Sequence, residues 1–210
     1  MLNTVTVNSE QIIKLYDFEL SGHCHKVRLF LSLLDIPFET ININLPKGEH
    51  KSDFFLNLNS FGQVPVLRDG DFIIADSNAI LVYLALKYDP LSVWLPVNPI
   101  TQAQIQRWLS AAAGPLAFGV ANIRAARVFK RTADLRAQEI SDILLAAMNL
   151  ELSKSKFLCT DQRPTIADIA MYSYTAHSPE GGINLEQYDN IMRWIKNIEL
   201  LPHFLGMKKS

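Results

Sequence analysis

The stretch Asn59 to Ser77, NSFGQVPVLRDGDFIIADS, decides the fold that we expect for the first half of the chain. The apolar residues from Val64 to Leu67 indicate a short strand, and Phe72 to Ile74 indicate a second one. The Asp69-Gly70 pair between them is typical of a tight hairpin turn. The stretch therefore predicts a β-hairpin that leads directly into an apolar helix over residues 78–88.

Pro65 interrupts the first of these strands because it has no backbone N–H to donate. It fits an edge position, or a turn in which the Val64-Pro65 bond is cis. In either case the backbone of Val64 stays free on one side, where an extended peptide could pair as an added strand. Asp76 and Ser77 open the following helix, whose N-terminus suits a carboxylate through its free N–H groups and its dipole. An ordinary N-cap is the alternative role for this pair.

The residues around this hairpin extend the pattern of strands and helices. We expect a strand over residues 12–18, a helix from His25 that stops before Pro37, and a strand over residues 38–44. A polar loop and a short helix follow at residues 47–58. The order is strand, helix, strand, hairpin, helix, which is the thioredoxin-like order. The first ten residues are polar, and we expect them to form a loose tail.

The second half of the chain predicts helices alone. Residues 89–99 contain three prolines and form the expected linker. The expected helices span residues 100–128, 134–152, 165–174 and 185–198. In the first, Gly114-Pro115 predicts a kink or break; in the second, we expect Ile140, Ile143, Leu144 and Ala147 on one apolar face. We thus expect a thioredoxin-like domain at 11–88 and an all-α domain at 100–210.

Thr165 and Asp168 form a local motif at the start of the third of these helices. Thr165 can cap the helix while Asp168 reaches back to it three residues later, as in a capping box. Losing such a cap costs about 1 kcal/mol. We interpret the motif as a folding element without a chemical role.

Composition limits the classes of function. Apolar residues make up 49% of the 210, which is ample for a core, and the net charge is −1 without a basic patch, which argues against nucleic acid. Cys24 and Cys159 are too few for a disulfide framework, so we expect a reducing, cytoplasmic setting. No apolar run has membrane-spanning length, and the first residues lack the pattern of a signal peptide.

The run with Gly62, Val64-Pro65 and Asp76-Ser77 resembles the glutathione site of the cytosolic glutathione S-transferases. Ser21 within LYDFELSGHCHKVR and His50 within KGEHKSDFF resemble the theta-like members, of bacterial type. The order of a small α/β domain and a helical domain is also that of the family, over nearly the whole chain.

This resemblance implies a role for each of these residues. The Val64-Pro65 bond would be cis, and the valine backbone would pair with the cysteinyl part of glutathione. Asp76 and Ser77 would hold the γ-glutamyl end, while His50 would meet the glycine carboxylate. Gln63 would reach the polar ends of the ligand. Family members are usually homodimers, which we expect here too.

Catalysis in such a site requires glutathione as a thiolate. A free cysteine thiol has a pKa of about 8.5, so little of it is ionised at neutral pH. A hydroxyl donor or a helix N-terminus near the sulfur lowers that pKa. Ser21 lies between the first strand and the first helix, and we expect it to be this donor; a simple helix cap is its alternative role. The thiolate would then attack an electrophilic carbon.

Two other functions remain open on sequence grounds. Cys24 lies three residues after Ser21, near the position at which beta- and omega-like transferases use a cysteine. It would support a glutathione-dependent thiol–disulfide reductase or a peroxidase through mixed disulfides. The third possibility is a protein that binds glutathione without turnover, as a carrier or a partner-binding module.

The remaining polar residues have simpler interpretations. His23, Cys24 and His25 are adjacent, so they cannot easily converge on one ion, and we expect no metal. His177 and His203 stand alone, and each is expected to be a satisfied surface or core histidine.

We expect the second substrate, an electrophile or a peroxide, between the domains, against Phe18, Leu20 and the first helix after the linker. A basic stripe on that helix is interpreted as a solvated face, of which one or two members could meet an acidic substrate: Arg107, Arg124, Arg127 and Arg131.

Overall fold

The computed structural model describes residues 12–210, so the tail expected at residues 1–10 lies outside the described part. Four strands form one mixed sheet in the order β2-β1-β3-β4. Strand β1 runs parallel to β2 and antiparallel to β3, with Leu15 opposite both Thr40 and Leu67. The strands are β1 (Ile13–Asp17), β2 (Phe38–Asn42), β3 (Val66–Asp69) and β4 (Phe72–Ala75). The expected hairpin is β3-β4, with Val64 and Pro65 lying immediately before its first strand.

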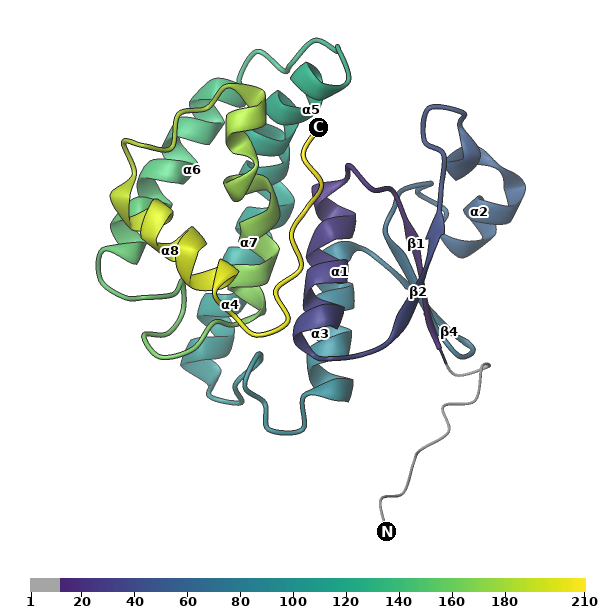
Figure 1. The fold of residues 1–210 in the computed structure, drawn as a ribbon, viewed down its shortest axis with the longest axis horizontal. Helices are drawn as coiled ribbons and strands as arrows, with labels where there is room; N and C mark the ends of the chain where they lie inside the picture. Colours follow the sequence, from purple (N-terminus) through teal and green to yellow (C-terminus); the bar gives the residue numbers. More distant parts are fainter. Residues whose placement is uncertain (1–11) are drawn as a thin grey trace.

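Helices α1 and α3 cover one face of this sheet and separate it from the helical half (Figure 1). The helices of this half are α1 (Gly22–Leu33), η2 (Glu49–Lys51), α2 (Asp53–Leu58) and α3 (Ser77–Tyr88). Helix α1 begins three residues before His25, where the sequence had suggested its start. The reason is that the Ser21 side chain accepts the N–H of Cys24 at 3.3 Å and caps the helix earlier.

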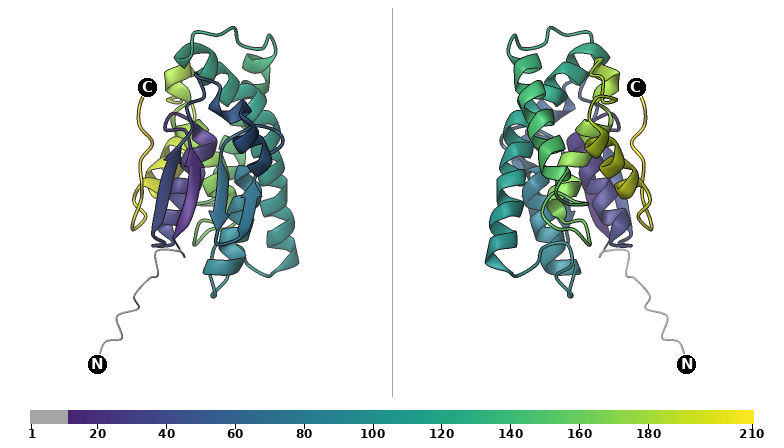
Figure 2. Two further views of the ribbon diagram at one scale, coloured as in Figure 1. Left: turned by 90° about the vertical axis from the view of Figure 1, so that its right-hand side faces the viewer. Right: turned by 90° about the vertical axis from the view of Figure 1, so that its left-hand side faces the viewer.

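The second half has no strand among the residues described. Its helices are α4 (Pro99–Ala111), η3 (Ala112–Ala121), α5 (Asn122–Val128), α6 (Ala137–Leu152), α7 (Ile166–Ala176), η4 (Ser178–Gly181) and α8 (Asp189–Glu199). They gather on one side of the α1/α3 layer, as the two side views show (Figure 2). The small α/β half followed by a helical half is the predicted fold. No helix in residues 12–210 is both long and apolar enough to cross a bilayer.

The break expected at Gly114-Pro115 is a change of helix type instead. The chain stays helical from Pro99 to Val128, and the ten residues from Ala112 to Ala121 form a π-helix that contains Pro115. A wider turn can accept a residue that lacks an N–H without ending the helix, and such stretches are frequent at functional sites.

Of the apolar face expected on α6, Leu144 is buried and Ile140 is half-buried, whereas the other two residues are exposed. Ile143 is 66% exposed, and Ala147 is also exposed. The buried face is Ala137, Ser141, Leu144, Leu145, Met148 and Leu152. Ser141 can be fully buried because its hydroxyl donates a hydrogen bond to the Ala137 carbonyl at 2.7 Å. A search for apolar residues at helical spacing does not include a serine, so this member of the buried face was not predicted.

One hydrophobic core runs through both halves of the chain. It joins Leu15 of the sheet and Leu81 of α3 to Trp108 of α4 and Ile169 of α7. Helices α1 and α3 both contact α7, so α7 is the centre of the molecule. All of its residues from Ile166 to Thr175 are buried.

Both hydrogen bonds of the expected capping box are present at the start of α7. Asp168 Oδ2 accepts the Thr165 N–H at 2.8 Å, and Thr165 Oγ1 accepts the Ala167 N–H at 3.3 Å. The Asp168 carboxylate also accepts from the Leu158 N–H and the Trp194 indole, each at 2.9 Å. This fully buried carboxylate therefore ties α7 to the preceding loop and to α8.

The C-terminal segment after α8 returns to lie along α1, as the yellow trace shows (Figure 1). The carbonyls of His203 and Leu205 accept hydrogen bonds from Ser32 and His25 of α1, both at 2.8 Å. Lys208 forms an ion pair with Glu19 at 2.9 Å. The segment thus fastens the end of the helical half to the first helix of the sheet half.

Candidate active site between the two halves

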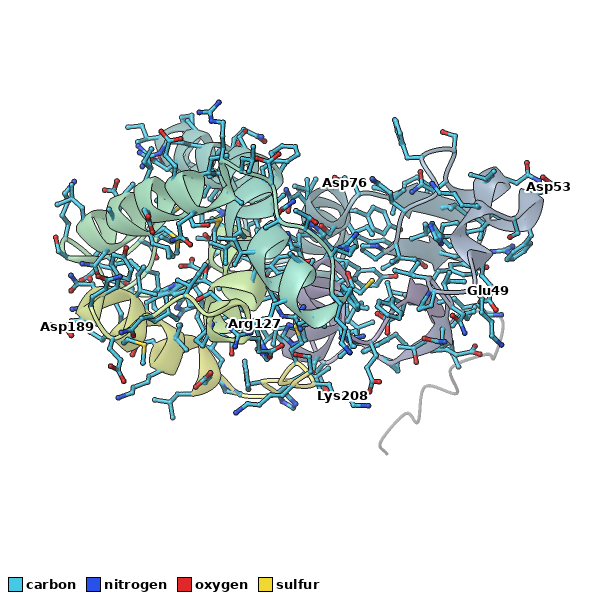
Figure 3. The ribbon with its side chains drawn as sticks, turned by 90° about the horizontal axis from the view of Figure 1, so that it is seen from above. Glu49, Asp53, Asp76, Arg127, Asp189 and Lys208 are labelled. Atoms are coloured by element: carbon cyan, nitrogen blue, oxygen red, sulfur yellow. The ribbon has the colours of Figure 1, made fainter. Side chains whose placement is uncertain are left out.

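A cavity of about 630 Å³ opens between the hairpin, the start of α3 and the π-helix η3. Its lining residues are His23, Leu58, Asn59, Ser60, Phe61, Gln63, Val64, Pro65, Ala75, Asp76, Ser77, Asn78, Ala113, Ala117 and Phe118. In Figure 3, Asp76 lies on the sheet half close to its junction with the helical half. Of the predicted site residues, the structure brings Gln63, Val64, Asp76 and Ser77 to this cavity.

The Val64-Pro65 peptide bond is cis, as expected. No described protein group hydrogen-bonds to the backbone N–H or C=O of Val64. The loop before it is held by Asn59, whose side-chain amide donates to the Gln63 carbonyl at 2.8 Å and accepts the Phe61 N–H at 3.1 Å. This leaves an unpaired stretch of extended backbone at the cavity wall, which the sequence pattern had indicated.

The start of α3 places an acid and a hydroxyl side by side. Asp76 Oδ1 accepts the N–H groups of Asn78 and Ala79, each at 2.9 Å, so these two are not free for a ligand as first expected. Asp76 has a φ of 72°, an uncommon value for a residue with a side chain, and is exposed to solvent. Its second carboxylate oxygen and the Ser77 hydroxyl remain for polar groups in the cavity.

Lys26 is a buried cation directly behind this helix start. It is fully buried, and its ammonium donates to Asn78 Oδ1 at 3.0 Å. Burial lowers the pKa of Lys26 to about 8, against the opposing effect of the Asp76 charge. The pattern of α1 gave no signal for it, because a lysine within an amphipathic helix is usually assigned to the solvent face.

His23 is the cavity residue that sequence reasoning missed. Its Nδ1 lies 3.4 Å from the Ser77 hydroxyl, and its ring meets the Tyr174 ring edge to face at 5.0 Å. Burial, followed by the Lys26 charge, lowers the pKa of His23 to about 3, so the imidazole is neutral at pH 7. His25 faces elsewhere, toward Ser173 and the C-terminal segment. The sequence feature that could have predicted His23 as a cavity residue is its position in the first turn of α1, two residues after Ser21.

Ser21 lies beside the cavity and is not among its lining residues. It is half-buried, and its hydroxyl oxygen accepts the Cys24 N–H, so the helix-cap role considered for it is present. Gly22 follows it directly beneath Tyr174: an added Cβ at this glycine would lie 2.7 Å from the phenol ring.

Cys24 does not support the redox alternative. It is fully buried, and its sulfur accepts the Phe18 N–H at 3.4 Å. Burial, with the charge of Asp17 adding to it, raises the pKa of the Cys24 thiol to about 12. A thiol that is neither exposed nor ionised cannot attack a disulfide or a peroxide, because the thiolate is the nucleophile.

His50 also stays outside the cavity lining, on the short helix η2. Its Nδ1 is buried without a hydrogen-bond partner among the described residues. The neighbouring Lys51 was not predicted as a site residue. Its ammonium lies 3.5 Å and 3.4 Å from the carbonyls of Phe61 and Gly62, which places a cation on the loop that forms the cavity wall.

A second cavity of about 280 Å³ lies on the helical side of His23. Its lining residues are His23, Ala117, Ala121, Asn122, Ala125, Ala126, Arg131, Thr132 and Tyr174. His23 and Ala117 belong to both cavities, so the two are adjacent. Phe18 and Leu20, where the second substrate was expected, line neither of them.

Arg124 was wrongly assigned to a solvated basic stripe. It is 1% exposed, and its guanidinium donates to the Leu20 carbonyl at 3.0 Å and to Glu180 at 2.9 Å. A buried arginine needs such partners, and only the tertiary fold brings Leu20 and Glu180 to it. Arg107, Arg127 and Arg131 are exposed as expected.

A thioredoxin-like half with an unpaired backbone beside a cis Val-Pro bond is joined to a helical half that lines the other side of the cavity, which defines a two-domain α/β and all-α class of fold. The chain belongs to the glutathione S-transferase family. Residues 20–87 match the family model "Glutathione S-transferase, N-terminal domain", and residues 108–202 match "Glutathione S-transferase, C-terminal domain".

Curated relatives and solved structures agree with this assignment. The chain is 42% identical to human glutathione S-transferase theta-2 over 83 residues, 40% of this chain and 34% of that protein. It is 40% identical to human theta-1 over 98 residues, 47% of this chain and 41% of that protein. These matches span less than half of the relatives' length. A crystal structure of a glutathione S-transferase from Pseudomonas fluorescens superposes with a TM-score of 0.87 at 28% identity, covering 94% of this chain and all of that one.

Proposed function

We propose that this protein is a glutathione transferase, which joins the glutathione thiolate to an electrophilic small molecule. The observation that carries the proposal is the meeting of unpaired Val64 backbone, Asp76 and Ser77 in one cavity. These groups match the cysteinyl backbone of glutathione and the ammonium and carboxylate of its γ-glutamyl end. The theta-class names of the relatives support the same activity.

The binding mode follows from the chemistry of the lining groups. The cysteinyl backbone of glutathione pairs with the N–H and C=O of Val64 as a short added strand. The free oxygen of Asp76 accepts from the γ-glutamyl ammonium, while the Ser77 hydroxyl donates to its carboxylate. The buried charge of Lys26 favours that carboxylate from behind. Gln63 binds the polar groups along the ligand, and the glycine carboxylate lies toward His50 and Lys51.

The thiol then lies near the start of α1. The Ser21 oxygen accepts the Cys24 N–H, and its hydroxyl hydrogen donates to the thiolate. This hydrogen bond stabilises the negative charge on the sulfur. The neutral imidazole of His23 faces the same space and stays uncharged at pH 7. The sulfur attacks the electrophilic carbon, and the leaving group departs with the bonding electron pair.

Calorimetry with glutathione tests the binding site. Ser77→Ala should weaken glutathione binding about tenfold, because a hydrogen bond to a charged group contributes about 1.5 kcal/mol or more. The matched control is Ser110→Ala on the exposed face of α4, whose affinity should equal that of the wild type. Absence of binding to the wild-type protein would reject the proposed function.

Ultraviolet absorbance of the bound thiolate tests the catalytic assignment on the same samples. Ser21→Ala should bind glutathione with little thiolate at neutral pH, and its conjugation rate should fall. Cys24→Ala should match the wild type in both respects. A loss confined to Cys24→Ala would favour thiol–disulfide chemistry instead. Binding and thiolate without turnover of any electrophile would favour the binding-protein alternative.

The proposal includes a reducing, cytoplasmic setting and a homodimer. Cys24 and Cys159 are both free thiols in the structure. Phe54, Phe61 and Phe72 are exposed by 62%, 79% and 47%, and all belong to the sheet half. Large apolar side chains that gather on a surface mark protein contacts more often than isolated ones do. Light scattering of the purified protein should give twice the chain mass.

A further inference from the structure

The second cavity has a polar end that lies away from the site of the thiol. His23 and Tyr174 lie next to the start of α1, where their ring centres are 5.0 Å apart. The wall along η3 and α5 is formed by alanines, which occupy little space. The other polar groups of the cavity come from Arg131 and Thr132, which follow the end of α5, and from Asn122, which is hydrogen-bonded to the Asp134 N–H of the same turn region. A molecule that fills this cavity therefore meets the thiolate with one end and hydrogen-bond donors with the other.

This polar end carries positive charge that no carboxylate neutralises. Within the described residues, Arg127, Lys130 and Arg131 have no acidic side chain within 4.0 Å. The nearest acid along the chain, Asp134, accepts the Arg136 N–H. Arg127 marks this end of α5 in Figure 3. The local field therefore favours an anion.

Arg131 lies at the cavity beside an aromatic ring. Its guanidinium carbon lies 5.6 Å from the centre of the Phe129 ring, and that ring lies 6.1 Å from the ring of Phe18. The Arg131 N–H also donates to the Ala126 carbonyl at 2.7 Å, which fixes the backbone after α5. A stacked guanidinium keeps its N–H donors free at its edge for a planar anion.

Asn122 presents donors toward the same place. Its side-chain oxygen accepts the Asp134 N–H at 2.9 Å, so the amide orientation is set and its NH₂ group is directed away from that turn. No described residue accepts from this NH₂ group. Together with the Thr132 hydroxyl and Arg131, it forms a set of donors without an acceptor.

We propose that the electrophile taken by this transferase carries a carboxylate or a similar planar anion, which binds Arg131 and Asn122 while its reactive carbon points to His23. The inference rests on the proposed function and specifies the substrate class of the same site. For an aryl halide acid, the thiolate sulfur bonds to the ring carbon and the carbon–halogen bond breaks. The halide leaves with the bonding electron pair, and the thiol proton passes to solvent.

Two S-conjugates of glutathione test this inference without requiring turnover. One is made from 4-chloro-3,5-dinitrobenzoate and the other from its methyl ester, so they differ in one negative charge. Calorimetry should show that the wild type binds the carboxylate conjugate about fivefold more tightly than the ester. Arg131→Gln should abolish this preference and leave the affinity for the ester unchanged. Arg131→Lys should retain part of it, because the charge remains.

Lys130→Gln is the matched control, since Lys130 is an adjacent cation that does not line the cavity. It should keep the full preference for the carboxylate, which separates direct contact from general surface charge. Equal affinity of the wild type for both conjugates, or a preference that survives in Arg131→Gln, overturns the inference while glutathione binding stands. Failure to bind glutathione itself and both conjugates overturns the proposed function and this inference together.

Discussion

Gly22 lies under the phenol ring of Tyr174, between the Ser21 cap and the His23 imidazole. A Cβ at this position would lie 2.7 Å from two ring carbons, closer than packed carbon atoms approach. Gly22→Ala must therefore displace either the ring or the first turn of α1. Both groups of the proposed thiol site are attached to that turn, so stability and catalysis depend on the same glycine.

We expect Gly22→Ala to lower the free energy of unfolding by about 1–3 kcal/mol, as overpacking does, and to reduce the conjugation rate. Gly114→Ala is the matched control within a helix, because nothing beyond its chain neighbours and its own helix backbone lies within 4 Å of its added Cβ. It should be neutral or slightly stabilising, since alanine is the better helix former by about 1 kcal/mol. Urea denaturation of both variants measures the contrast, and equal unfolding midpoints would contradict it.

At the residue scale, the local sequence predicted the hairpin residues that line the first cavity better than it predicted the side chains contributed by α1 and α5. Val64, Asp76 and Ser77 come from one continuous hairpin and helix start, so a short pattern contains their geometry. His23 and Arg124 depend on Ser77, Leu20 and Glu180, which are remote in sequence from them. The His23 contact exists only after α1 has packed against α3, and the Arg124 contacts exist only after α5 has packed against η4 and the turn before α1.

At the scale of single elements, the start of α7 depends on one buried carboxylate. Asp168 accepts from two backbone N–H groups and the Trp194 indole, and it also contacts the Thr165 hydroxyl at 3.2 Å. Thr165 itself provides one capping bond to the helix. The two members of the capping box therefore differ in how many buried donors each one satisfies.

Thr165→Ala should cost about 1 kcal/mol, the usual value of a lost N-cap. Asp168→Ala should cost about 3–5 kcal/mol or prevent folding, because it leaves several buried donors without partners at about 1–3 kcal/mol each. Guanidinium denaturation followed by circular dichroism gives both values. Asp168→Asn, which keeps one acceptor oxygen, should fall between them. A ranking with Thr165→Ala as the most damaging change would refute this account.

Element order could be read from the sequence, because hydrophobic period, prolines and the Asp69-Gly70 turn act locally. The strands, the hairpin and the succession of helices follow that expectation. The π-helix from Ala112 to Ala121 was not anticipated, since a proline within an apolar stretch predicts a kink or break and gives no sign of a change of helix type. The α6 face was half right, with Leu144 buried and Ile143 exposed, because Ser141, a polar residue, belongs to the core.

At the scale of the whole molecule, His25 joins three parts of the chain. It lies on α1, its Nδ1 is 2.8 Å from the Ser173 hydroxyl of α7, and its Nε2 is 2.8 Å from the Leu205 carbonyl. Since a carbonyl only accepts, Nε2 carries the proton and Nδ1 accepts from Ser173. Burial lowers the pKa of His25 to about 3, and the charges of Arg28, His177 and Arg124 act in the same direction.

Acid should therefore destabilise the fold. The unfolded histidine binds a proton below a pKa of about 6.5, whereas the folded one stays neutral down to about 3. Stability is thus full above pH 6.5 and falls as the pH drops toward 3. We expect His25 alone to lower the free energy of unfolding by about 2 kcal/mol from pH 7 to pH 5.

Urea unfolding of the wild type and His25→Gln at these two pH values measures this effect. The variant should be less stable at pH 7 and should lose less stability on acidification. His203→Gln is the control, since its side chain is 56% exposed, and it should follow the wild type. Identical pH dependence in His25→Gln and the wild type would show that other groups set the acid sensitivity.

The alanines at positions 113, 117, 121 and 125 recur every fourth residue and line the two cavities. Apart from glycine, any residue that replaces an alanine is larger. A substitution at one of these positions therefore reduces the volume of the cavity that it lines. Ala121 and Ala125 line the second cavity alone, away from Val64, Asp76 and Ser77. Under the proposed function, single substitutions at these two positions would narrow the range of electrophiles and leave the proposed glutathione site unchanged.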